Sequence, residues 1–483
     1  MWLVIFPSIV ITSIILHLDG GHFTYTLDDP YIHLALAKNI MLGTYGINPG
    51  ELEAPSSSIL WPFLLAPFSV LPEVAYELTP LVVNLLCLSV FVFILNLLFA
   101  ALPMRQRLFT MACVVLSLNA IGLVFNGMEH ELQVVLVALI VLGLVRKTYR
   151  YVYIAAIILP FVRYEGLAIS LPALVYCFYT VNRRYSLLAL IVIAIGMCSF
   201  SLWLHSHGLG YLPSSVLAKS RMTDGVFSIT YNFLKNLKQY GFMVPAICVL
   251  GLYYWRIDRA MALVVISATT LHLLFGQSGW YGRYEVYWLT FVLLLAMCAV
   301  LDWLTVERFA YVVPLAAALP FFFTELAWDT ISVPLASSNI ANQQGRMADI
   351  ARALGEPVAA NDIGLISLRS HVYVLDVLGL GSIAVLRARQ AGVGSAWIES
   401  AMKSKGIEYA FIYDAWYPDR PRDWIKVATL NLLEHRVSAG RLIVSFYATN
   451  RAAAAKLREV MERDVARVDW GRARIDFSDP LPN

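Results

Sequence analysis

Apolar runs dominate the first 324 residues. Most of these runs are close in length to the about 20 residues that a helix needs to cross a bilayer. They cover residues 1–18, 79–101, 108–125, 132–145, 186–204, 241–254, 261–276, 284–301 and 309–324. Charged side chains are concentrated elsewhere, because 37 of the 69 lie in residues 325–483. The sequence therefore predicts a polytopic helical membrane protein that ends in a water-soluble part, and it excludes an ordinary cytosolic enzyme.

The segment 151–181 allows two interpretations. As one long helix it would place Arg163 and Glu165 inside the membrane, where ionised groups are costly. Two short spans, about 151–161 and 166–181, leave both residues at a helix end. We prefer the second interpretation, which gives eleven transmembrane helices in all.

The distribution of basic residues supports eleven spans, because short cytoplasmic loops are enriched in Lys and Arg. With the N-terminus inside, ten of the 17 basic residues of the first 324 fall in inner loops. A single span over 151–181 would move the basic loops at 183–184 and 256–259 to the outer side. The eleven-span topology places the first loop, residues 19–78, and the tail outside, with Met1–Leu18 as an uncleaved anchor.

Beyond residue 324 the pattern changes to short alternating elements. Helices are predicted at 342–354, 395–404 and 451–462, and strands at 357–360, 372–377, 409–413 and 442–447. This alternation is typical of a small α/β domain. We therefore divide the chain into a transmembrane module, residues 1–324, and an extracytoplasmic α/β domain, residues 325–483.

The net charge and the histidines narrow the class of function. The net charge of +3 comes from 36 basic and 33 acidic residues without a basic stripe, so nucleic acid is not an expected partner. The histidines are scattered without HExxH-like spacing, so the pattern does not indicate a metal site. The need for a divalent cation is left open.

The most prominent polar motif is Asp28-Asp29 in the first outer loop. Asp29 suits a helix N-cap and Pro30 a first turn, so that Ile32, Leu34 and their apolar neighbours would lay an amphipathic helix on the membrane interface. A cap needs one carboxylate, however, and two adjacent acids beside a helix N-terminus can also supply a general base. Both interpretations stay open at this point.

Further charged clusters fall on the same outer face. They are Glu129-His130-Glu131, Arg163-Tyr164-Glu165, Lys219 with Arg221, and Arg283-Tyr284-Glu285. The acid–base pairs fit interfacial ion pairs or anchors as well as functional groups. Lys219 and Arg221 are basic residues of an outer loop, where the positive-inside rule does not expect them. Phosphate binding is therefore a more plausible role for them than setting the orientation of the protein in the membrane. Together these clusters suggest a site that binds an anionic headgroup and moves a proton.

Several motifs, taken in order along the chain, resemble those of GT-C membrane glycosyltransferases, which use polyprenyl-phosphate sugar donors. The likeness is closest to the branch that includes bacterial arabinofuranosyltransferases. The matching segments are DDPYIHLALAKNI from Asp28, YGINPGE from Tyr45, SSSILWPFLLAPF from Ser56, NGME from Asn126, RYEG from Arg163, LPSSVLAK from Leu212, GRY from Gly282, NDIG from Asn361 and VLD from Val374. Each motif is short, but the ordered set spans most of the chain.

The resemblance implies an inverting transfer, in which an aspartate of the outer loop deprotonates an acceptor hydroxyl that attacks the anomeric carbon as the lipid phosphate leaves. It makes Asp28 the first candidate for the base, with Asp29 as the alternative. The candidates for binding the donor phosphate are Lys219, Arg163, Arg283 and Arg221. The candidates for orienting the sugar hydroxyls, or these basic residues, are Glu129, Glu165, His33 and Tyr31.

The chain departs from the family pattern at Tyr164, Ser214 and Tyr284, which replace Pro, Asn and Phe. These departures leave the donor sugar open, with arabinofuranose as the first choice, and the acceptor is a glycan, a lipid or a protein. The resemblance implies a bacterial plasma membrane with the active site on the periplasmic face. Two other classes stay open: a transporter or flippase of a lipid-linked anionic sugar, and a non-catalytic subunit of glycan assembly.

Overall fold

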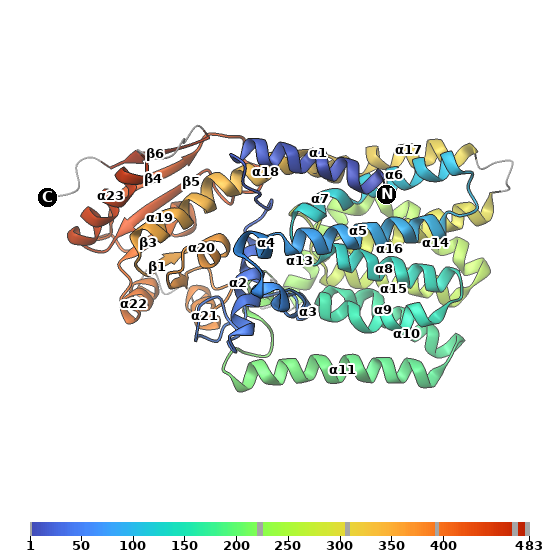
Figure 1. Cartoon of the computed structure of the whole chain (residues 1–483). Coiled ribbons are helices and arrows are strands. Elements are labelled where there is room, and N and C mark those ends of the chain that lie inside the picture. Colours follow the sequence, from blue (N-terminus) through green and yellow to red (C-terminus); the bar gives the residue numbers. More distant parts are fainter. Residues whose placement is uncertain (1, 220–225, 305–309, 392–395, 466–471, 479–483) are drawn as a thin grey trace.

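The computed structural model describes residues 2–219, 226–304, 310–391, 396–465 and 472–478. Helices form most of this part of the chain, and its six strands all lie beyond residue 357. The long helices lie side by side at one end of the molecule, and the sheet lies at the other end (Figure 1).

The helical part is made of elements of very different lengths. In chain order they are α1 (Trp2–Leu18), α2 (Asp29–Met41), α3 (Leu60–Leu65), α4 (Glu73–Glu77), α5 (Thr79–Leu98), α6 (Met104–Ser117), α7 (Ala120–Phe125), α8 (His130–Val145), α9 (Tyr149–Val162), α10 (Leu167–Thr180), α11 (Arg183–Ser206), α12 (Ser214–Lys219), α13 (Val226–Tyr240), α14 (Val244–Ile257), α15 (Arg259–Phe275), α16 (Val286–Trp303), α17 (Val312–Phe322) and α18 (Thr324–Ile340).

Four helices of the described residues are long and apolar enough to cross a membrane. They are Glu73–Leu98, Arg183–Ser206, Ile229–Ile257 and Val286–Trp303. A fifth span is reached when Val312–Phe322 and Thr324–Leu354, which meet at a bend of 67°, are counted as one. The structure thus supports membrane association, with fewer full-length spans than the eleven that the sequence predicts.

The difference in the number of spans comes from helix length. Several predicted spans form apolar helices of 10–17 residues instead, namely Trp2–Leu18, His130–Val145, Tyr149–Val162 and Arg259–Phe275. A helix rises about 1.5 Å per residue, so a helix of this length reaches only part of the way across about 30 Å of hydrocarbon. The sequence therefore predicts the apolar character of these segments correctly. It does not predict the length of each helix, because tertiary packing determines where the helix ends.

The predicted break within 151–181 is confirmed. Helix α9 ends at Val162, and Arg163 has an extended backbone with φ −153° and ψ 137°. A short 3₁₀ turn over Tyr164–Gly166 leads into α10. The two polar residues of this segment therefore lie between two helices rather than inside one.

The tail folds around a six-stranded mixed sheet with the order β2-β1-β3-β5-β4-β6. The strands are β1 (Val358–Ala360), β2 (Val374–Asp376), β3 (Tyr409–Ile412), β4 (Ile425–Leu432), β5 (Ile443–Ala448) and β6 (Ala473–Phe477). β1 pairs in parallel with β2 and β3, and the other pairs are antiparallel. The helices around it are α19 (Arg346–Leu354), α20 (Gly364–Arg369), α21 (Ile383–Gln390), α22 (Ala396–Ser404) and α23 (Arg451–Val465).

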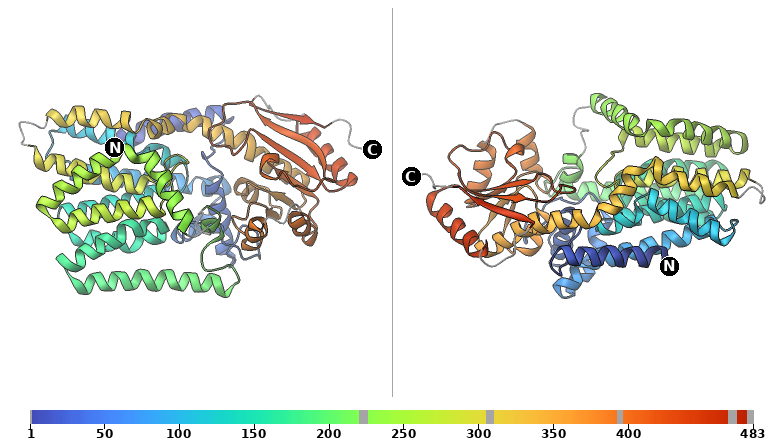
Figure 2. Two further views of the ribbon diagram at one scale, coloured as in Figure 1. Left: turned by 180° about the vertical axis from the view of Figure 1, so that it is seen from behind. Right: turned by 90° about the horizontal axis from the view of Figure 1, so that it is seen from above.

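Helix α2 forms a layer between the bundle and the tail, as two views of the molecule show (Figures 1 and 2). Its Tyr31 and Leu34 belong to the apolar core of the helical part. Its Ile32 belongs to the core of the tail, together with Ile363 and Val374. Both sides of α2 are therefore covered by protein, so it does not lay a free apolar face on lipid as the amphipathic-helix interpretation expects.

Candidate functional site

The carboxylate of Asp28 is held by the tail. Its Oδ2 accepts a hydrogen bond of 2.6 Å from the backbone N–H of Gly364, and its Oδ1 accepts one of 2.8 Å from Leu365. These N–H groups open α20, whose first amides lack partners within the helix. Asp28 therefore caps a helix that lies 336 residues further along the chain. Each oxygen of Asp28 therefore accepts one hydrogen bond from the tail, and Asp28 as the base, with Asp29 as the alternative, stays a prediction.

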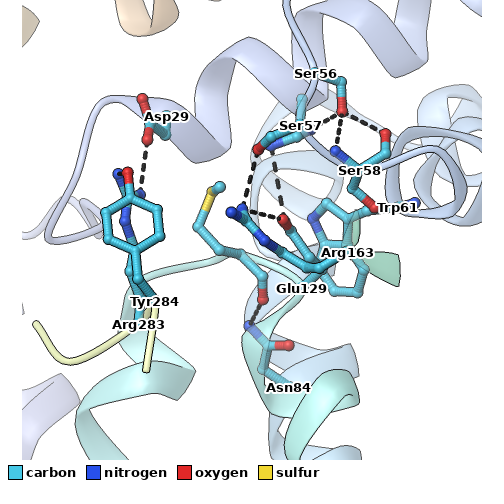
Figure 3. A network of polar contacts seen from close by, with 12 residues as sticks. Asp29, Ser56, Ser57, Ser58, Trp61, Asn84, Glu129, Arg163, Arg283 and Tyr284 are labelled. Carbon is cyan, nitrogen blue, oxygen red and sulfur yellow. Dashed lines mark hydrogen bonds and ion pairs between the residues drawn. The ribbon is translucent and has the colours of Figure 1, made fainter. Parts of the chain in front are cut away.

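Asp29 faces a cation instead of backbone amides. Its Oδ2 lies 2.7 Å from Nη1 of Arg283, and the two side chains are 18% and 5% exposed. Nη2 of Arg283 donates to the hydroxyl of Tyr284 over 3.0 Å, and Nε has no hydrogen-bond partner among the described residues. The buried guanidinium thus keeps donor capacity beside a partly exposed carboxylate (Figure 3). We call this contact the Asp29–Arg283 pair.

Arg163 is the centre of a second polar network (Figure 3). Its Nη1 donates over 3.0 Å to both Ser57 Oγ and Glu129 Oε1. Its Nε and Nη2 donate to the two oxygens of Glu165, over 3.1 Å and 2.6 Å. These bonds use four of the five N–H groups of the guanidinium, and its expected contact with a phosphate stays a prediction. Glu129 and Glu165 orient the basic residue, which is one of the two roles expected for them.

His33 links this network to the first loop. Its Nε2 lies 3.8 Å from Oε2 of the fully buried Glu129, and its Nδ1 lies 3.2 Å from Oγ of Ser56. The motifs DDPYIH, SSS, NGME and RYEG, distant in sequence, therefore meet in space. The histidine lies between a hydroxyl and a carboxylate, and its expected orienting role stays a prediction.

Tyr31 does not take the role expected for it. Its side chain is fully buried, and its hydroxyl accepts a hydrogen bond of 3.0 Å from the backbone N–H of Tyr25. The guanidinium of Arg369 lies over its ring at 5.8 Å. Tyr31 packs between the helical part and the tail, so it is a structural residue rather than one that orients a sugar.

A pocket of about 310 Å³ opens beside the Arg163 network. Its polar wall comes from Ser57, Arg163, Glu165 and Tyr284. The rest is mostly apolar and is lined by Leu167, Ala168, Leu171, Leu212, Val216, Leu271 and Phe275, from α10, α12, α15 and the loop before α12. Both Arg163 and Arg283 lie over the ring of Tyr284, at 5.5 Å and 4.9 Å. Tyr284 thus joins the pocket to the Asp29–Arg283 pair.

The two other basic candidates are described only in part. The backbone of Lys219 ends α12, whose Val216 lines the pocket. The side chain of Lys219 and the whole of Arg221 lie outside the described residues. Of the four predicted phosphate ligands, only the side chains of Arg163 and Arg283 are therefore described: Arg163 lines the pocket, and Arg283 pairs with Asp29.

A group of polar residues from the tail was not predicted as part of the site. Oδ2 of Asp362 accepts hydrogen bonds from the hydroxyl of Tyr413 and, over 2.7 Å, from Nε2 of Gln344. Asp362 also interacts electrostatically with Asp28 and Asp29. The NDIG motif contains Asp362, but nothing in the sequence places it against the first loop.

Two acidic residues at this junction, Asp28 and Asp362, have a raised pKa. Burial, and then the negative charge of Asp362, raise the pKa of Asp28 to about 7, against the effect of its two backbone donors. Burial also raises the pKa of Asp362. Perturbed carboxyl groups of this kind are common in sites that move protons.

No group of three or more His, Cys, Asp or Glu side chains with the geometry of a metal site occurs among the described residues. The carboxyl groups at the junction are held by neutral donors and by Arg283. The need for a divalent cation remains as open as the sequence leaves it.

Comparison with known proteins gives one match, which covers less than half of the chain. A family model described as a domain of unknown function (DUF8728) matches residues 338–449. This range contains Gln344, Asp362 and Tyr413. No curated protein and no solved structure matches the chain.

Proposed function

We propose that this protein is an inverting glycosyltransferase that moves a sugar from a polyprenyl-phosphate donor to an acceptor hydroxyl on the outer face of a bacterial plasma membrane. The Asp29–Arg283 pair is the observation that carries this proposal. Such a transfer needs a base for the hydroxyl and a cation for the departing phosphate. A partly exposed carboxylate and a buried guanidinium supply both groups, and the ion pair that joins them at 2.7 Å must open when donor and acceptor bind between them.

The reaction assigns one role to each partner. Asp29 takes the proton of the acceptor hydroxyl, and the hydroxyl oxygen bonds to the anomeric carbon from the face opposite the leaving group. The bond between that carbon and the phosphate oxygen breaks, and its electron pair stays on the phosphate. Arg283 stabilises the charge that develops there, because its guanidinium is buried where electrostatic interactions are strong.

The pocket supports a lipid-linked donor. Its walls are mostly apolar, and its polar residues Ser57, Arg163 and Tyr284 lie together with the start of α10. An apolar cavity with a few convergent polar groups suits a ligand that has an apolar chain and a polar head. The resemblance to GT-C enzymes adds the identity of the head as a phosphate linked to a sugar, with arabinofuranose as the first choice.

The positions of the polar residues favour an enzyme over a transporter. A transporter for an anion is expected to carry polar groups near the middle of its spans. Here Glu129 precedes α8, Arg163 lies between α9 and α10, and Arg283 precedes α16. All three lie at helix ends and none lies in the middle of a helix, which fits a site at one end of the bundle.

The test is transfer from a panel of polyprenyl-phosphate sugars by the purified full chain in lipid bilayers. We expect Asp29→Asn to lower transfer by about 10²- to 10⁴-fold, the usual contribution of a general base. Donor binding by the same variant should persist, because Arg283 is unchanged. Asp414→Asn is the matched control, since this tail carboxylate pairs with Lys426 away from the first loop.

Two results would contradict the proposal. Transfer by a folded Asp29→Asn variant at the wild-type rate would exclude Asp29 as the base. Failure of the wild-type protein to bind any polyprenyl-phosphate sugar would favour the two other functions, that of a transporter and that of a non-catalytic subunit.

A further inference from the structure

The loop that leads to Arg283 has an unusual backbone. Its four residues 279–282 have positive φ angles of 107°, 52°, 64° and 64°. Two of them, Trp280 and Tyr281, are bulky aromatic residues, for which this left-handed region is uncommon and costs free energy. Such a conformation persists only where surrounding contacts hold it, and it is frequent at functional sites. The contacts of the 279–282 loop therefore indicate what fixes the position of Arg283.

The carbonyl oxygen of Tyr281 is held by a side chain from a distant segment. Nδ2 of Asn119 donates to this oxygen over 2.9 Å, and Oδ1 of Asn119 accepts over 2.8 Å from the hydroxyl of Thr330 in α18. A carbonyl oxygen only accepts hydrogen bonds, so Asn119 must present its nitrogen to Tyr281 and its oxygen to Thr330. The hydroxyl of Thr330 therefore fixes the orientation of the amide that holds the loop.

Asn119 is itself placed for this contact. It is fully buried just before α7, and its backbone is left-handed with φ 51° and ψ 28°, a conformation that Asn tolerates better than most residues. Gly122 leaves room for the amide, because a Cβ atom at this position would overlap Oδ1 of Asn119. Asn119 and Gly122 together thus allow an amide to reach the loop from the start of α7.

Two further contacts fix the ends of the loop. The backbone N–H of Gly279 donates over 3.0 Å to Oε2 of Glu285, a buried residue that precedes α16. Gly282 packs so closely against Leu326 that a Cβ atom would overlap Cδ2 of that side chain. Leu326 and Thr330 are four residues apart in α18 and therefore share one face of it. Helix α18 thus supports the loop both directly and through Asn119.

We propose that Asn119 is a positioning residue of the donor site, which holds the 279–282 loop so that Arg283 reaches Asp29 and the phosphate of the donor. This inference rests on the proposed function for the role of Arg283 (Figure 3). Without its contacts, a strained loop relaxes to other conformations. Each contact therefore raises the fraction of molecules in which Arg283 is in place, and loss of one weakens the apparent donor affinity in proportion.

The first test is hydrogen exchange of the purified full chain in lipid, without any donor. Asn119→Gly removes the amide but keeps a residue that adopts a left-handed backbone readily. Thr330→Val removes the hydroxyl with little change of shape. Both variants should exchange the amides of residues 279–283 faster than the wild type, because the loop is released. Thr330→Ser keeps the hydroxyl and should exchange them at nearly the wild-type rate, and the amides of β3 report global stability.

The second test measures the affinity for a polyprenyl-phosphate sugar. We expect Asn119→Gly and Thr330→Val each to weaken it by about tenfold, the factor that corresponds to one lost hydrogen bond of a buried group. Thr330→Ser should retain the affinity. A merely structural defect would lower the number of binding sites and leave the affinity of the folded molecules unchanged. Because Thr330 acts through Asn119, the double variant should lose no more than Asn119→Gly alone.

Wild-type exchange of residues 279–283 in both Asn119→Gly and Thr330→Val would overturn the inference. So would faster exchange in these variants with an unchanged donor affinity, because the loop would then not govern Arg283. A wild-type protein that binds no polyprenyl-phosphate sugar would contradict the proposed function. Faster exchange in the two variants would still support Asn119 as the residue that holds the loop, so the two failures can be told apart.

Discussion

Asp28 and Asp29 are neighbours in sequence but have opposite surroundings. Asp28 is fixed by two backbone N–H groups of the tail, and Asp29 faces the buried guanidinium of Arg283. Asp28 is thus held by neutral donors, whereas Asp29 is held by a cation. Function at the residue scale thus depends on which partner each carboxylate meets.

Gly364 allows Asp28 to approach the tail. A Cβ atom at this position would lie 2.0 Å from the carbonyl oxygen of Asp28 and 2.8 Å from its Oδ2. We expect Gly364→Ala to push the first loop away, at a cost of about 1–3 kcal/mol for overpacking. The measurement is hydrogen exchange of the Leu365 amide, which should become faster.

Gly345→Ala is the matched control for this substitution. Its Cβ would lie 3.7 Å from the carbonyl oxygen of Ile340, an ordinary contact. Exchange of the Leu365 amide should stay unchanged in this variant. Equal protection of Leu365 in Gly364→Ala and in the wild type would show that Asp28 does not hold α20.

The residue types of the site could be predicted from the sequence, but their pairing could not. Charged motifs at predicted helix ends identified Asp29, Arg163 and Arg283 as candidates. The choice between Asp28 and Asp29 depends on α20, which follows more than 300 residues later. No local pattern reports a contact between segments so far apart, and Asp362 was missed for the same reason.

At the scale of elements, the sequence predicts those features that depend on residues close together in the chain. The charged residues between α9 and α10 broke an apolar run, as expected. Strand β4 was missed, and so was β6, an edge strand with polar side chains at exposed positions. The apolar pattern of α2 also suits a helix with one lipid-facing side, because the pattern does not reveal that protein covers both sides.

The packing of α2 leads to a test at the same scale. Ile32 is 3% exposed and lies in the core of the tail. We expect Ile32→Ala to lower stability by about 2–5 kcal/mol, through lost burial and the cavity that remains. The measurement is the thermal unfolding midpoint of the purified protein in lipid.

Met41→Ala is the control on the same helix, since Met41 is 52% exposed. It should leave the unfolding midpoint nearly unchanged. Equal midpoints for Ile32→Ala and Met41→Ala would mean that α2 does not join the two parts of the molecule.

At the scale of the whole molecule, residues from the helical part and from the tail meet at one junction. Asp29 lies at the start of α2, Arg283 precedes α16, and Asp362 precedes α20 in the tail. The tail therefore belongs to the candidate site itself. If the site acts on a lipid-linked donor at the outer face, the tail must lie on that face too.

This requirement can be tested by labelling single cysteines in a chain whose six native cysteines have been replaced. Ser404 is exposed in the tail, and Arg183 is exposed at the start of α11. An impermeant thiol reagent should label Ser404→Cys in intact cells, because the tail is expected outside. It should label Arg183→Cys only after lysis, since this basic loop is expected inside.

The two positions act as controls for each other, because each reports a different side of the same membrane. Labelling of Arg183→Cys, but not of Ser404→Cys, in intact cells would reverse the topology. The junction of Asp29, Arg283 and Asp362 would then face the cytoplasm, and a transfer reaction on the outer face would be excluded. The expected pattern would place that junction on the side where the proposed reaction occurs.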